Sequence, residues 1–132
     1  MTDTPYAVCG VGDIANRRGK GFHLLRRDAD GAEKPWHILI VRWDRKLYGY
    51  VNLCPHQGVN LDWEREQFFD PNGTRLICGK HGALFDVTSG ECIEGPCRNA
   101  RLEPVRLSVL DGEVCVHGVE LVEEDVPALS RT

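Results

Sequence analysis

The stretch from Trp36 to His56, WHILIVRWDRKLYGYVNLCPH, holds two strand-like runs and the first part of a candidate metal site. The runs WHILIVRW and LYGYVNL are rich in β-branched and aromatic residues, which favour strands. The intervening DRK is short enough for a tight turn, so the two runs predict a β-hairpin. Its second strand delivers Cys54 onto a loop, where Pro55 and His56 follow directly.

The rest of the chain continues this pattern. TRLIC predicts a short strand that delivers Cys78, ALFDV and ECI predict a hairpin around TSG, and VRLSVL and EVCVHG flank Asp111-Gly112, a type I′ turn signal. Turn residues recur about every eight to twelve positions, which indicates an all-β fold with few helices. We expect the sheet to end at Gly118, so that residues 1–118 form the domain and 119–132 a loosely attached acidic tail.

Length and charge restrict the function classes. The chain has 132 residues, enough for one domain, and a net charge of −4 with acidic and basic residues interleaved. Without a basic stripe, nucleic acid is not an expected partner. The longest apolar run, Ile38 to Val41, is too short to span a bilayer, and the first residues do not resemble a signal peptide. We therefore expect a soluble, cytoplasmic protein that does not bind membranes and whose partners are proteins.

The cysteine content points to metal. In a secreted scaffold six cysteines would allow 15 disulfide connectivities. Without a signal peptide, metal binding is the stronger expectation. The six are Cys9, Cys54, Cys78, Cys92, Cys97 and Cys115.

Two segments share one plan, since each places a cysteine shortly before a histidine. Cys54 and His56 follow one predicted strand, and Cys78 and His81 follow another. A tetrahedral zinc ion accepts two cysteines and two histidines, so zinc stays open as an alternative. Zinc modules usually take both cysteines from one knuckle and both histidines from a helix. Mixed loops suit a two-iron cluster better, with both thiolates on one iron and both imidazoles on the other.

These segments resemble the two cluster-binding boxes of Rieske [2Fe–2S] proteins, through CPHQG and CGKHGALFDVTSGECIEGPC. The resemblance extends from Tyr6 to Gly118. It implies a Rieske-like fold of small antiparallel sheets, with a cluster-binding subdomain formed by two loops and covered by a third loop at Gly95-Pro96. It also implies one [2Fe–2S] cluster per chain, whose ligands are Cys54 and Cys78 on the inner iron and His56 and His81 on the outer iron.

The resemblance further implies a Rieske-type ferredoxin, a one-electron carrier between a reductase and an oxygenase or other oxidoreductase, and not an enzyme. Three alternatives stay open: a small Rieske subunit of a larger enzyme such as a nitrite reductase, the cluster domain of an oxygenase, and a zinc-stabilised interaction module. Glu113 and His117 could share a strand face, but nothing near them in the sequence completes an iron triad of two histidines and a carboxylate. No catalytic residue is therefore predicted.

The ligand set bears on the reduction potential. The charges of two ferric ions, two sulfides and two thiolates cancel, which raises Rieske potentials to about −150 to +300 mV, against about −400 mV with four cysteines. High-potential relatives also carry a disulfide between the loops, and a serine and a tyrosine after the second histidine. In this chain those positions hold Val59 and Lys80, Ala83 and Phe85, so we predict a potential near the low end, about −150 mV.

The segment from Leu61 to Arg75 is long for a compact relative. Its DPNG predicts a turn within an enlarged hairpin or a short helical turn. Its aromatic residues, Trp63, Phe68 and Phe69, form either a docking surface or a local core. The non-ligand cysteines and histidines are expected to be structural, namely Cys9, Cys92, Cys97 and Cys115, and His23, His37 and His117.

Overall fold

The computed structural model describes residues 5–54, 61–62, 67–78, 82–95, 100–118 and 120–121. In these residues the regular structure is eleven β-strands and one 3-10 turn, so the all-β prediction is confirmed. No helix in these ranges is long and apolar enough to cross a membrane. The elements are β1 (Tyr6–Gly10), η1 (Val11–Asp13), β2 (Gly19–Arg27), β3 (Glu33–Trp43), β4 (Lys46–Val51), β5 (Leu76–Ile77), β6 (Leu84–Phe85), β7 (Cys92–Glu94), β8 (Pro104–Val105), β9 (Leu107–Leu110), β10 (Glu113–Val116) and β11 (Glu120–Leu121).

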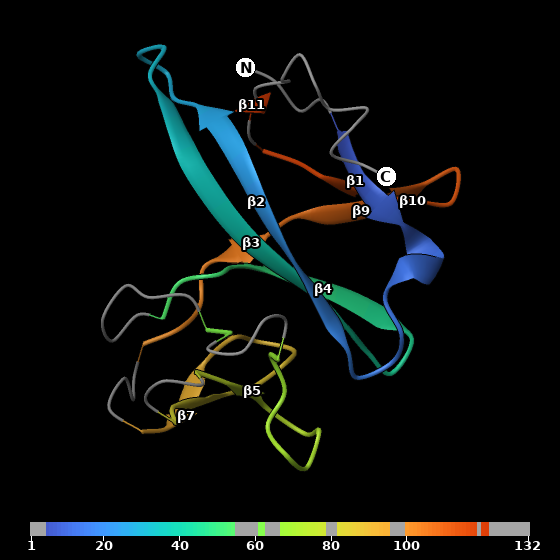
Figure 1. Cartoon of the computed structure of the whole chain (residues 1–132), viewed down its shortest axis with the longest axis vertical. Coiled ribbons are helices and arrows are strands. Elements are labelled where there is room, and N and C mark those ends of the chain that lie inside the picture. The colour runs from blue at the N-terminus through green and yellow to red at the C-terminus, as the bar shows by residue number, and fades with distance from the viewer. Residues whose placement is uncertain are drawn as a thin grey trace.

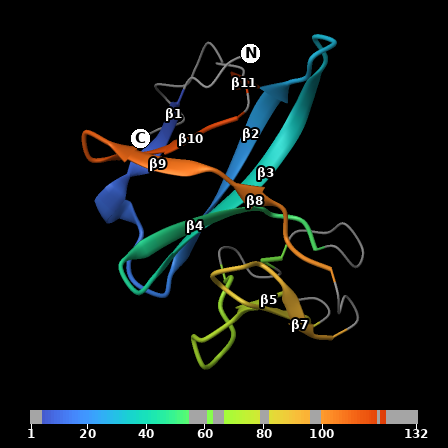
Figure 2. The ribbon, with the colours of Figure 1, turned by 180° about the vertical axis from the view of Figure 1, so that it is seen from behind.

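The strands form three antiparallel sheets, in the orders β11-β2-β3-β4-β8, β1-β10-β9 and β5-β6-β7. The first two sheets make up a main body, and the long β2 and β3 run diagonally across it (Figure 1). The sheet containing β5 and β7 lies apart from β1, β9 and β10, below the long strands in both views (Figures 1 and 2). We call this sheet and the loops beside it, residues 52–54, 61–62, 67–78 and 82–95 of the described chain, the small lobe.

Strand β3 is buried on both faces, which explains its continuous apolar run. Ile38 and Ile40 belong to one core cluster, which lies within the main body. Leu39 and Val41, which point the opposite way, belong to a second cluster that includes the small lobe. All four side chains are fully buried. The small lobe therefore packs on one face of the five-stranded sheet, and the core of the main body lies on the other face.

Both predicted tight turns are present. Strands β3 and β4 are joined by Asp44-Arg45, with φ of 51° and 78°, and β9 and β10 by Asp111-Gly112, with φ of 51° and 79°. Two successive positive φ values define the type I′ turn, whose twist matches the flanking strands. The β6–β7 hairpin around TSG is confirmed as well.

The prediction that the sheet ends at Gly118 is wrong. Glu120 pairs with Arg27 and Leu121 with Arg26, so β11 extends the sheet beyond β2. The edge of β2 would otherwise present unpaired backbone groups, and Leu121 adds an apolar contact with the core of the main body. The acidic tail at 119–132 falls, apart from these two positions, outside the described residues.

The long insertion forms a hairpin in its described part, residues 67–78, as the first of its two alternatives predicted. Phe69 forms a bridge with Leu76, and the backbone N of Asp70 donates to the carbonyl of Arg75 at 2.9 Å. Phe68 is 1% exposed and lies in the small-lobe core, so for this residue the local-core interpretation is confirmed. Phe69 stacks on Trp43 at 6.2 Å between ring centroids, whereas Trp63 lies outside the described residues.

Candidate metal centre

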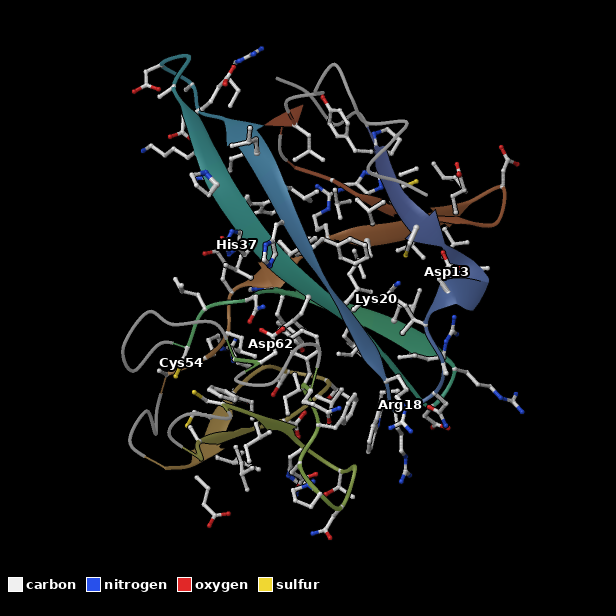
Figure 3. All side chains as sticks on the ribbon, viewed as in Figure 1. Asp13, Arg18, Lys20, His37, Cys54 and Asp62 are labelled. Carbon is white, nitrogen blue, oxygen red and sulfur yellow. The ribbon has the colours of Figure 1, made fainter. Side chains whose placement is uncertain are left out.

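The first candidate loop begins where β4 ends. The backbone N of Asn52 donates to the carbonyl of His37 at 2.8 Å, which continues the pairing of β4 with β3 by one residue. Two residues later Cys54 is fully buried, although Leu53 between them is 48% exposed. Cys54 lies on the small-lobe side of the long strands (Figure 3). The described chain stops here, so the predicted ligand His56 lies outside the described residues.

The second candidate loop begins where β5 ends. Cys78 follows this strand directly and is fully buried. Its backbone N donates to the carbonyl of Ala83 at 2.9 Å, and its carbonyl accepts from the N of Gly82 at 2.7 Å. These bonds close the base of the loop. Gly82 has a φ of +74°, a conformation that side chains disfavour, and His81 lies outside the described residues.

Cys54 and Cys78 belong to one cluster of buried side chains, which also contains Leu61, Ala83 and Phe85. The fold thus brings together two cysteines that are far apart in the sequence. Cys92 lies in the same cluster, but it begins β7 and its thiol donates to the carbonyl of Glu94. Cys54 and Cys78 instead stand where the chain leaves a strand for a loop, a position from which both thiolates can reach one metal. This part of the predicted ligand set therefore fits a cluster whose inner iron takes both thiolates.

The start of the predicted covering loop packs tightly on the second ligand loop. Gly95 follows β7 with a φ of +106°, and a Cβ at this position would lie 2.8 Å from the Cα of Ala83. Real Cβ atoms do not approach backbone this closely, so only glycine fits. Pro96, the other residue of the predicted loop, lies outside the described residues.

The turn between β6 and β7 is held by one carboxylate. Asp86 Oδ1 accepts bonds from the backbone N of Thr88 at 2.8 Å, from Thr88 Oγ1 at 2.7 Å and from the backbone N of Ser89 at 3.1 Å. The bond from the Thr88 side chain is the largest of the influences that lower the pKa of Asp86. These bonds fix the conformation of the turn, although the flanking strands β6 and β7 are only two and three residues long.

Tyr50 on β4 attaches this turn to the main body. Its buried hydroxyl donates to the carbonyl of Val87 at 2.6 Å. Burial raises the pKa of Tyr50 to about 12. Gly90 lies against the ring, since a Cβ there would be 2.7 Å from Tyr50 Cε1.

The sequence interpretation missed the residues that hold the loops, namely Tyr50, Asn52 and Asp62. Asn52 is 1% exposed, and it is the one buried polar residue in the described part of the chain. The sequence does hold a signal for Asn52. Side chains alternate between the two faces of a strand, so Asn52 shares the face of Tyr50, which points toward the small lobe. A buried asparagine two residues before a candidate ligand cysteine calls for a hydrogen-bonding role.

The remaining histidines and cysteines lie mainly in structural settings. His23 and His37 are partners in the β2–β3 ladder, and their rings stack at 4.2 Å. His117 Nε2 lies 2.6 Å from Ser108 Oγ. Cys92 and Cys115 are buried, as predicted; Cys9 is partly buried, and Cys97 lies outside the described residues. Within the described ranges, no three His, Cys, Asp or Glu side chains are grouped to hold a metal ion.

Comparisons with known sequences agree with this geometry. The family model described as Rieske [2Fe-2S] domain matches residues 4–110. The ferredoxin component of the alkene monooxygenase system of Xanthobacter autotrophicus is 27% identical over 117 residues, which cover 89% of this chain and 84% of the relative.

Solved structures show the same fold. The ferredoxin of carbazole 1,9a-dioxygenase from Nocardioides aromaticivorans IC177 has a TM-score of 0.64 and 25% identity, covering 86% of this chain and 96% of that one. A chain from a complex of reduced oxygenase and oxidised ferredoxin in carbazole 1,9a-dioxygenase has a TM-score of 0.64 and 24% identity, covering 93% of this chain and 100% of that one.

Proposed function

The chain belongs to the Rieske [2Fe–2S] domain family and carries one such cluster, and we propose that it is the ferredoxin component of a multicomponent oxygenase. In this role it accepts one electron from a reductase and passes it to a terminal oxygenase. The relatives support the role, since two of them are named ferredoxins of oxygenase systems and the match covers 84% and 96% of their lengths. The chain is thus an electron-transfer protein rather than an enzyme.

The ligand assignment is part of this proposal. Cys54 and Cys78 hold the inner iron, and His56 and His81 hold the outer iron. The observation that carries it is the burial of Cys54 and Cys78 in one cluster, each at the end of a strand that enters a separate loop. The bound cluster supplies reversible one-electron transfer. The chain's own contribution is to exclude water from the two sulfurs and to fix the bases of the loops.

The partners follow from the same relatives. One of the similar solved structures is a complex between an oxygenase and a ferredoxin, which supports a terminal oxygenase as the electron acceptor of this chain. A terminal oxygenase of carbazole 1,9a-dioxygenase from Novosphingobium sp. KA1 shares the fold at a TM-score of 0.64, but at 16% identity and over only 31% of that chain, so the ferredoxins support their role better. A permanent subunit of a nitrite reductase and a zinc module have no comparable support. We also propose a cytoplasmic location, because the non-ligand cysteines Cys9 and Cys115 form no disulfide, as in a reducing compartment.

Metal analysis and a reductive titration test the proposal. We expect about two irons and two sulfides per chain and reduction by one electron per chain. The reduced protein should then transfer its electron to a terminal oxygenase and return to the oxidised spectrum. One zinc per chain without sulfide would contradict the assignment, and a stable large complex on purification would favour a permanent subunit.

A further inference from the structure

Asn52 connects the two ends of the first ligand loop. Its side-chain Oδ1 accepts a bond from the backbone N of Leu61 at 2.8 Å, and its Nδ2 donates to Asp62 Oδ1 at 3.0 Å. Its backbone N is bonded to His37 on β3. One side chain thus fixes the chain just before Cys54 and again at residues 61 and 62. The segment between these points carries the predicted ligands Cys54 and His56.

The far end of the loop is anchored independently of any metal. Leu61 is fully buried in the small-lobe core. The second carboxylate oxygen of Asp62 lies over β2, since a Cβ at Gly21 would be 3.8 Å from Asp62 Oδ2. Figure 3 shows Asp62 beside the long strands, on the same side as Cys54. Asn52 therefore joins the start of the loop to residues that pack against the core and β2.

The chemistry of the pair requires an amide at position 52. The backbone N of Leu61 needs an acceptor, and the carboxylate of Asp62 needs a donor. An asparagine side chain supplies both, whereas a carboxylate supplies only acceptors. Asn52→Asp keeps the size of the side chain, removes this donor and places two carboxylates in contact in a partly buried setting, where like charges repel.

We propose that Asn52 is a positioning residue for the cluster, which closes the first ligand loop through Leu61 and Asp62 and so slows the release of iron. This inference rests on the proposed ligand roles of Cys54 and His56. Asn52 itself is not a ligand of the iron. Its effect acts through the loop, so it should alter how long the cluster is retained.

The test is a double-mutant cycle at positions 52 and 62. The rate of cluster loss is measured from the decrease in visible absorbance in excess iron chelator. We expect Asn52→Asp to lose its cluster about tenfold faster, the scale of one hydrogen bond to a charged group replaced by a repulsive contact. Asp62→Asn keeps an oxygen that accepts from Asn52, so its rate should stay within about threefold of the wild type. In the double variant Asn52→Asp with Asp62→Asn, the amide at 62 donates to the carboxylate at 52, and retention should return to within about threefold.

Asn16→Asp is the matched control, because Asn16 Oδ1 accepts from the backbone N of Asp44 in an exposed turn of the main body and an aspartate can do the same. Its cluster should be retained as in the wild type. Equal retention in the wild type and Asn52→Asp, or a double variant no better than Asn52→Asp, overturns the inference. If Asn52→Asp does not fold, recovery of folding and retention in the double variant supports the inference, and failure of both overturns it. A wild-type protein without a [2Fe–2S] cluster would instead contradict the proposed function.

Discussion

The main body and the small lobe are stabilised in different ways. In the main body β2 has nine residues and β3 eleven, and they pair along the whole length of β2. In the small lobe β5 and β6 have two residues each, and β7 has three. Isolated ribbons of that length are unstable in water. The small lobe must therefore depend on contacts other than its backbone ladder.

Those contacts are individual side chains that bond to backbone. Asp70 Oδ1 accepts from the backbone N of Thr74 at 2.9 Å, and Asp86 holds the β6–β7 turn. Tyr50 ties the lobe to β4, and Asn52 holds Leu61. Ladder bonds do not depend on side-chain identity, whereas each of these does. Single substitutions should therefore affect the small lobe more than the main body, and the cluster should be its largest single support.

The largest effect is expected at the ligands. Cys78→Ala, or His56→Ala or His81→Ala, should abolish the intact cluster, because a methyl group cannot coordinate iron. Iron analysis and the visible and paramagnetic spectra measure the loss. Hydrogen exchange should then accelerate in β5, β6 and β7 while β2 and β3 stay protected.

Cys115→Ala is the control for this prediction, since Cys115 is buried in β10 of the main body. It should leave the iron content unchanged. A normal spectrum in any of the three ligand variants would show that the ligand assignment is wrong, and uniform exchange through both regions would contradict the division into two stabilised parts.

The second effect concerns the contact between β7 and the second ligand loop. Gly95→Ala should lower the free energy of unfolding by about 1–3 kcal/mol, because the new Cβ meets backbone at Ala83 and the φ of +106° is strained. Gly112→Ala is the matched comparison, with a φ of +79° but no atom within 4 Å of the added Cβ. Chemical denaturation should show a larger loss of unfolding free energy for Gly95→Ala than for Gly112→Ala. Only Gly95→Ala should also release its cluster faster. Equal losses would mean that backbone strain alone decides both.

The third effect is at the link from β4 to the β6–β7 turn. Tyr50→Phe removes the donor to Val87 and should cost about 1–2 kcal/mol of unfolding free energy. Tyr48→Phe on the same strand is the control. Because the pKa of Tyr50 is raised to about 12 in the folded state, the unfolded chain loses this proton first, from about pH 10.

The contribution of Tyr50 is therefore complete below about pH 10 and is lost as the pH rises through about 12. Denaturation curves at increasing pH should show stability declining across this window. Tyr50→Phe should decline less steeply than the wild type. Identical slopes would argue that Tyr50 is not the group responsible.

The same contrast explains what the sequence could predict. Strand β3 and the two tight turns follow from local composition, and the candidate ligand cysteines follow from their motif spacing. The pairing of β11 with β2 depends on the free edge of β2, which lies far from β11 in the sequence and next to it only in the folded chain. The clamp between Asn52 and residues 61 and 62 depends on tertiary contacts across a loop, which no local pattern encodes. Local sequence is thus most informative where backbone ladders stabilise the fold and least informative where single side chains do.

The smallest effect expected is on the reduction potential, which depends on what surrounds the cluster sulfurs. Ala83 and Phe85 are fully buried and occupy the positions where high-potential relatives carry serine and tyrosine. Neither side chain has a hydroxyl to stabilise the more negative reduced cluster. High-potential relatives also have a disulfide between the two loops. Val59 and Lys80 occupy its two positions in this chain, and both residues lie outside the described residues.

We therefore expect a midpoint near the low end of the Rieske range, about −150 mV, which suits acceptance of electrons from a flavin reductase. Phe85→Tyr should raise the midpoint by tens of millivolts, since about 59 mV corresponds to a tenfold change for one electron and a partly formed bond is worth less than that. Phe22→Tyr makes the same chemical change on β2 of the main body and should leave the midpoint unchanged. Direct voltammetry near neutral pH decides between the outcomes. A wild-type midpoint above about +100 mV would contradict both the hydrogen-bond argument and the ferredoxin role, because such a cluster holds its electron too tightly to reduce a low-potential acceptor.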